Sequence, residues 1–307
     1  MALAGDIEAL DYNTIRANII EVMGTGLGTY GYGQTIVSSA VSAGNTITAE
    51  QWTQLRFDII NTLTHQTGNT PSAVLISTSD VIDDQASDPV INYTTLTTQA
   101  RTNRFDLAPS QSVTSVIGTP KTYTSSWSSL ASLTCTLTFN NANEARYFFN
   151  SGGNIKVTAS RTGGSSTLQN ASWTALLTEA GTQIFKASAT EENNFYTLTN
   201  AYQTIYELSA SAAYANNTYR ISAKCDVTNN NTGTATEVDI KIDLIDNYVD
   251  SGPEVAPGDA INGTLTISLE EQKALGTLQP SDISEGGPTG NFSITSPTFS
   301  VSNITAT

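Results

Sequence analysis

Through the first third of the chain, apolar residues recur every three or four positions, which is the period of an amphipathic helix. The first stripe of this kind consists of Ile15, Ile19, Val22 and Met23. Asn13 or Thr14 can cap a helix at this point, and Gly24 is placed to end it. A short helix with one buried face is therefore predicted near the N-terminus.

Two further helices carry clearer boundary signals. Thr48 and Gln51 have the spacing of a capping box, and Gly68 is placed as a C-cap. The apolar stripe between these residues consists of Trp52, Leu55, Ile59 and Leu63. A third helix is predicted to begin near residues 87–89, with Pro89 in its first turn. Its stripe consists of Val90, Tyr93, Leu96 and Ala100. Residues 68–72 and 77–86 are predicted to be linkers.

After residue 120 the apolar positions alternate with polar ones, as in the strands of an antiparallel sheet with one wet face. The clearest case is a hairpin about residues 229–233. Its apolar positions are Tyr219, Ile221, Ala223, Cys225 and Val227 before the turn, and Val238, Ile240, Ile242 and Leu244 after it. On the polar face, Arg220 and Lys224 are expected to oppose Asp239 and Asp243. Further strands are predicted near residues 132–139, 155–160 and 265–269, and short helices over 142–149 and 172–179.

These patterns predict an α+β fold, with an N-terminal helical region followed by a mainly antiparallel β-sandwich domain. Residues 109–120 are rich in Ser and Thr, so the division is placed there. We expect a helical docking and assembly region over residues 1–110, a linker over 111–120 and the sandwich over 121–307.

Composition narrows the functional classes. Of the 307 residues only 13% are charged, and the net charge is −15. Lys and Arg form no cluster, so direct nucleic-acid binding is not expected. No apolar stretch has the length of a membrane span, and the first ten residues do not resemble a signal peptide. Cys135 and Cys225 fall on apolar strand faces and are expected to be buried free thiols.

Candidate chemistry is sparse, and no catalytic residue, cofactor or metal is expected. The one histidine, His65, lies in the last turn of a predicted helix, where a surface or capping role is favoured by the helix dipole. The glycines of residues 24–28 follow a helix rather than a strand, so they do not indicate a nucleotide site. Asp239 and Asp243 share a strand face with Lys241, which is typical of a solvated sheet. The acidic runs 80–84 and 246–250 lack the spacing of a calcium loop.

Tyrosines on a glycine-rich loop are good contact residues, because they add area at a low cost in entropy. Tyr30 and Tyr32 lie on such a loop, over residues 25–33. A subunit contact is one interpretation of these residues, and packing on their own domain is the other. Together with His65 and Gln66 they form the candidate contact set.

In residues 31–68, from GYGQ to HQTG, and in residues 145–155, ARYFFNSGGNI, the chain resembles virion structural proteins of marine tailed phages, cyanophages in particular. The first part consists of residues 31–34 (GYGQ), 47–52 (ITAEQW), 55–59 (LRFDI) and 65–68 (HQTG). The second is residues 145–155 (ARYFFNSGGNI), whose FFNSGG core is similar to a motif of tail-associated proteins of such phages. The same motif also has a physical interpretation, since its glycines allow a short helix to reverse into a strand.

The resemblance implies a non-enzymatic structural component of the virion, associated with the tail, neck, baseplate or fibre and assembled in the host cytoplasm. Its expected partners are other phage structural proteins and further copies of itself. Two alternatives remain open. One is a capsid decoration protein. The other is a carbohydrate-binding receptor-recognition protein, for which the sparse aromatic residues give no support to a host glycan as partner.

Overall fold

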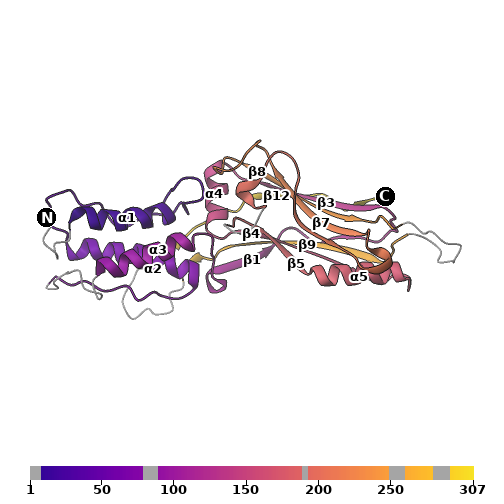
Figure 1. Ribbon diagram of the computed structural model, residues 1–307, viewed down its shortest axis with the longest axis horizontal. Helices are drawn as coiled ribbons and strands as arrows, with labels where there is room; N and C mark the ends of the chain where they lie inside the picture. The colour runs from indigo at the N-terminus through magenta and orange to yellow at the C-terminus, as the bar shows by residue number, and fades with distance from the viewer. Residues whose placement is uncertain (1–7, 79–88, 189–192, 249–259, 279–290) are drawn as a thin grey trace. The chain divides into compact units, whose positions relative to one another are not determined.

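The structure is a computed structural model that describes residues 8–78, 89–188, 193–248, 260–278 and 291–307. Contacts divide the chain into two units. The helical unit comprises Met1–Val113, Asn143–Gly153 and Lys273–Ser296. The sheet unit comprises Thr114–Ala142, Asn154–Gln272 and Pro297–Thr307. The α+β class with antiparallel sheets is confirmed (Figure 1). The predicted division at residues 111–120 is a single cut along the sequence, whereas the helical unit also includes two later segments.

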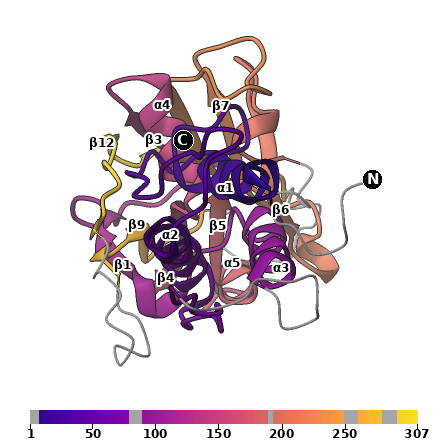
Figure 2. The same ribbon diagram turned by 90° about the vertical axis from the view of Figure 1, so that its left-hand side faces the viewer.

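Three helices build most of the helical unit. They are α1 (Ala9–Met23), α2 (Ala49–Thr67) and α3 (Pro89–Thr102). Each packs against the other two, and Figure 2 views them nearly end on. The indole of Trp52 lies at their centre, with edge-on ring contacts to Tyr12 at 5.1 Å and to Tyr93 at 5.6 Å between centroids. The predicted stripes therefore meet in one apolar core, whose fully buried members include Ile19, Leu55, Ile59 and Ala100.

The start of α1 was predicted wrongly. The helix begins at Ala9, because the Asp11 carboxylate accepts a hydrogen bond from the backbone N–H of Glu8 at 3.0 Å and caps the first turn. Asn13 lies inside the helix, and its side-chain amide pairs with both backbone groups of Val41 at 2.7 and 3.0 Å. Asn13, which was predicted to cap the helix, therefore holds the loop at Val41 instead. The end of the helix at Gly24 is as predicted.

The caps of α2 are confirmed. The hydroxyl of Thr48 accepts from the backbone N–H of Gln51 at 3.2 Å, and the Gln51 side chain accepts from the backbone N–H of Thr48 at 2.9 Å. Gly68 ends the helix in the left-handed region, with φ of 75°. Helix α3 begins at Pro89 as expected, while the linker predicted over residues 77–86 falls mostly outside the described residues.

Replacing Thr48 with alanine should therefore lower the free energy of unfolding of the helical unit by about 1 kcal/mol, the usual value of an N-cap. Hydrogen exchange of peptides from α2 would measure it. A matched control is Thr53→Ala in the second turn of the same helix, where we expect a change within about 0.5 kcal/mol. Equal effects of the two substitutions would contradict the assigned cap.

The sheet unit contains two antiparallel sheets, which Figure 1 shows as two layers. The first has the order β1 (Ser112–Val116), β9 (Thr264–Ala274), β4 (Asn154–Thr162), β5 (Thr182–Lys186), with β2 (Lys121–Tyr123) also paired to β9. The second has the order β12 (Thr298–Val301), β3 (Leu130–Thr138), β8 (Glu237–Ile245), β7 (Thr218–Cys225), β6 (Gln203–Ser209), with β13 (Thr305–Ala306) also paired to β3. Helix α5 (Leu168–Ala180) packs on β4 and β6.

The predicted hairpin register is confirmed. Strands β7 and β8 place Arg220 opposite Asp243 and Lys224 opposite Asp239. The Lys224 ammonium lies 3.3 Å from the Asp239 carboxylate, and the Lys241 ammonium lies 2.9 Å from that of Asp243. The opposite face is apolar and buried, and it includes the two cysteines as free thiols.

Residues 112–116, which were assigned to a linker, form strand β1. Their side chains show little apolar alternation, because β1 lies at the edge of its sheet and is held through the backbone by β9. Such an edge strand leaves a weak signal in the sequence.

Candidate functional site

The four residues predicted to contact another subunit all belong to the helical unit, and three of them are buried. Tyr32 and His65 have no exposed surface, and Gln66 is 4% exposed. These three side chains pack within their own unit and leave no surface for a subunit contact, contrary to the prediction. Tyr30 is partly exposed, and its ring lies beneath the guanidinium groups of Arg101 and Arg104 at 5.5 and 4.8 Å.

His65 is a packing residue rather than a surface residue. Its ring stacks on Phe292 with 3.9 Å between centroids and 8° between planes, and Tyr32 leans against it at 5.2 Å. Phe292 lies on β11 (Asn291–Phe292), which pairs with β10 (Gly276–Thr277). This aromatic partner comes from a segment more than two hundred residues later, so local sequence could not show that the histidine is covered.

Hydrogen bonding sets the tautomer of this imidazole, and burial keeps it neutral. Its Nε2 lies 2.8 Å from the carbonyl oxygen of Ser151, which can only accept, so Nε2 carries the proton. The buried Nδ1 has no partner among the described residues. Burial lowers the pKa of His65 to about 4, although the bond to Ser151 acts in the other direction. The ring is therefore neutral near pH 7.

Tyr32 and Gln66 complete this buried centre. The Tyr32 hydroxyl donates to the carbonyl oxygen of Arg104 at 2.8 Å and accepts from the Gln66 amide at 2.7 Å. That amide also donates to the carbonyl of Ala100 at 2.9 Å. Desolvation raises the pKa of the Tyr32 phenol above its usual range, which keeps it a donor. The cluster joins α2, α3 and the glycine loop.

The glycine loop is held by side chains from α4 (Ala142–Asn150). The Arg146 guanidinium donates to the carbonyls of Thr25, Gly28 and Tyr30 at 2.9, 3.2 and 3.0 Å. The Asn150 amide donates to those of Gly28 and Gly31, each at 3.2 Å. Sequence reasoning missed both roles. The available signal was an arginine and an asparagine four positions apart on one face of a short helix.

The glycines of the FFNSGG motif have the architectural role expected of them. Gly152 has a φ of 84°, and a Cβ there would lie 2.5 Å from the Cβ of Leu107. A Cβ on Gly153 would lie 2.4 Å from the carbonyl oxygen of Phe148. Both positions therefore exclude a side chain, as expected of a tight turn directly after α4.

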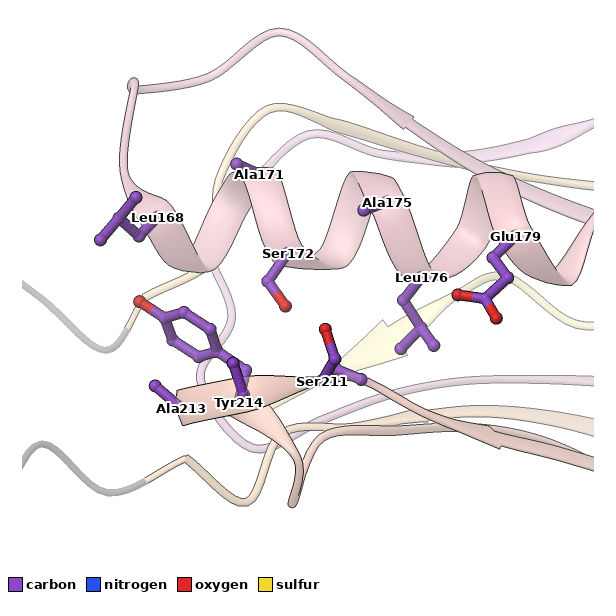
Figure 3. A pocket seen from close by; sticks show the side chains of 11 residues that line it. Leu168, Ala171, Ser172, Ala175, Leu176, Glu179, Ser211, Ala213 and Tyr214 are labelled. Carbon is purple, nitrogen blue, oxygen red and sulfur yellow. The ribbon is translucent and has the colours of Figure 1, made fainter.

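A second feature is an apolar groove in the sheet unit, with a volume of about 430 Å³. It lies between α5 and the 3-10 turn η3 (Ala212–Tyr214). Figure 3 shows Ser172, Leu176 and Glu179 pointing from the helix toward the segment of Ser211. The Leu168 side chain at one end is 78% exposed.

The first turn of α5, which carries Leu168, was also missed, because the predicted helix began at residue 172. Thr167 was the available signal: its hydroxyl accepts from the backbone N–H of Asn170 at 3.2 Å and caps the helix.

The groups that could perform chemistry are engaged in packing or ion pairs. Burial raises the pKa of the Cys135 thiol to about 12, which disfavours the thiolate. Asp243 is paired with Lys241 and accepts from the Ser132 hydroxyl at 2.6 Å. Among the described residues, no three His, Cys, Asp or Glu side chains gather as metal ligands would. The acidic run 80–84 and residues 249–250 lie outside the described residues.

Within the part of the chain that the structure describes, none of the helices combines the length and apolarity that a bilayer crossing requires. No protein-family model matches the chain, and neither a curated protein nor a solved structure was found to match it.

Proposed function

We propose that this chain is a non-enzymatic structural component of a tailed-phage virion, associated with the tail, neck, baseplate or fibre. The observation that carries the proposal concerns the two segments that resemble such proteins. They meet in one buried centre, where His65 of the first bonds to the Ser151 carbonyl of the second, 86 positions away. Asn150 of the second likewise donates to the Gly31 carbonyl of the first. As far as residue 153, the resembling residues therefore lie together in the helical unit rather than in two unrelated places.

A structural role is supported by the side chains that could otherwise react, because they are already bonded to or packed against other groups of the chain. The one histidine is neutral, stacked and bonded to backbone, so it is poorly placed to act as a base. The carboxylates of Asp239 and Asp243 are matched by lysines on the same sheet face. A structural subunit works through surfaces rather than through a reactive cleft, and repeated copies or other particle proteins are the partners that we propose.

Purified virions of the phage that encodes this chain should contain the polypeptide in a fixed stoichiometric multiple. Quantitative mass spectrometry of gradient-purified particles would measure it. Absence of the polypeptide from particles that contain the major capsid protein would contradict the proposal. A gold label on the chain in intact particles would separate a tail or neck position from capsid decoration.

A further inference from the structure

A single leucine stands out on the surface of the helical unit. Leu27 is 83% exposed, and it lies between Gly26 and Gly28, whose φ values of 45° and 54° lie in the left-handed region. The loop that presents it is held through backbone carbonyls on both sides of Leu27 by Arg146. Leu27 is thus an apolar knob on a preorganised loop, which lowers the entropy lost when it binds.

A cation accompanies this knob. The Arg104 guanidinium donates to the Thr29 carbonyl at 3.1 Å and lies over the Tyr30 ring at 4.8 Å. It is partly exposed, and with the described residues it forms no ion pair. The surface around Leu27 therefore combines an apolar side chain with a positive charge.

The groove of the sheet unit has the opposite character. Ala171 and Ala175 are small and exposed, so the α5 side of the groove leaves space for a larger side chain. Glu179 is the charged residue of the lining, and it forms no ion pair with the described part of the chain. In Figure 3 Glu179 lies at one end of the groove and Leu168 at the other. The groove thus offers an apolar slot beside a negative charge.

We propose that Leu27 of one copy of this chain inserts into the α5 groove of another copy, with Arg104 facing Glu179. The occupant is a second copy because the knob, the slot and the two complementary charges are all present on one chain. The two contact surfaces differ, so two copies that exchange both contacts form a two-fold dimer, and copies that make one contact each, head to tail, form a ring or a filament. The inference deepens the proposed function and rests on it, since a particle subunit needs a repeated contact.

The size of the contact predicts its strength. One leucine and one ion pair bury far less than the roughly 1,000 Å² of a stable interface. Association should therefore be weak in solution, with a Kd on the order of 10⁻⁴ M, and should tighten only when several contacts act together.

Disulfide trapping tests the geometry with the full chain. A Leu27→Cys variant mixed with an Ala175→Cys variant should cross-link between chains under mild oxidation. The native thiols of Cys135 and Cys225 are buried and should not interfere. The matched control is Thr178→Cys, which is exposed on the same helix but does not line the groove. We expect cross-linking at least about tenfold slower with the control, a difference of about 1.4 kcal/mol. Equal rates would overturn the proposal.

Sedimentation velocity over a range of concentrations tests the energetics. Leu27→Asp should abolish self-association, and Glu179→Arg should weaken it. Both side chains are exposed, so neither substitution should unfold the chain. A wild-type chain that stays monomeric up to about 1 mM would overturn the proposal, as would association that is insensitive to Leu27→Asp.

These outcomes are independent of the virion experiment. A chain that associates through this contact but is absent from particles would contradict the proposed function alone. A chain found in particles whose assembly tolerates Leu27→Asp and Ala175→Trp would contradict the contact alone.

Discussion

Replacing Arg146 with alanine is expected to lower the free energy of unfolding of the helical unit by about 4 kcal/mol. Arg146 is 6% exposed, and its guanidinium donates to three carbonyls of the glycine loop, at Thr25, Gly28 and Tyr30. A hydrogen bond to a charged group contributes about 1.5–3 kcal/mol, and the loss of several on one side chain is less than additive. Hydrogen exchange of peptides from the loop and from α2 would measure the change.

Two further variants show whether the loss comes from this geometry. Arg146→Lys should recover little, because an ammonium group cannot donate to three carbonyls in a planar fan. Arg101→Ala provides the matched control in the same unit, since the ion pair of Arg101 with Glu21 at 3.0 Å is about 40% exposed on each side. An exposed pair contributes at most about 1 kcal/mol. If Arg146→Ala lowered the free energy of unfolding no more than Arg101→Ala does, the role of Arg146 in holding the glycine loop would be refuted.

The stability of the helical unit should fall as the pH is lowered from about 6.5 to about 4, by about 3 kcal/mol from His65 alone. Burial lowers the pKa of the folded-state imidazole to about 4, whereas an unfolded chain has the ordinary value near 6.5. Between these values the unfolded state binds a proton that the folded state does not. The contribution is therefore fully present above pH 6.5, is lost progressively on acidification and stays lost below pH 4.

His65 is the only histidine of the chain, so its ring resonances titrate in a proton NMR spectrum without ambiguity of assignment. The folded-state pKa should be read directly from that titration. Urea unfolding of the wild type and of His65→Gln at pH 7 and pH 4.5 would give the linked stability. The glutamine amide can still donate to the Ser151 carbonyl but does not titrate, so carboxylate effects common to both proteins cancel. A folded-state pKa near 6.5 would disprove the buried neutral histidine.

The elements predicted with success are those whose signals are local. The capping box of Thr48 and Gln51 joins residues three positions apart, and the structure contains both bonds. The register that pairs Lys224 with Asp239 follows from alternation on two strands joined by a short turn. Such features depend on near neighbours in sequence, so pattern alone is sufficient.

The predictions about the candidate site failed where the partner is distant. His65 was expected at the surface, yet Phe292 covers its ring from a segment near the other end of the chain. Asn13 was expected to cap a helix, yet it holds the backbone of Val41. Helical spacing shows which side chains share a face, but not which later segment packs on that face.

By itself the sequence determined the helical and the alternating segments, their main caps and the pairing of charges on the sheet hairpin. Only the tertiary structure decided what holds the glycine loop, because the guanidinium that donates to its carbonyl at Tyr30 comes from a residue 116 positions away. It also decided which candidates are exposed, since burial is set by packing between segments rather than by residue type. Tyr32, His65 and Gln66 are buried and Leu27 is exposed, so the contact that we propose uses Leu27 and the groove along α5.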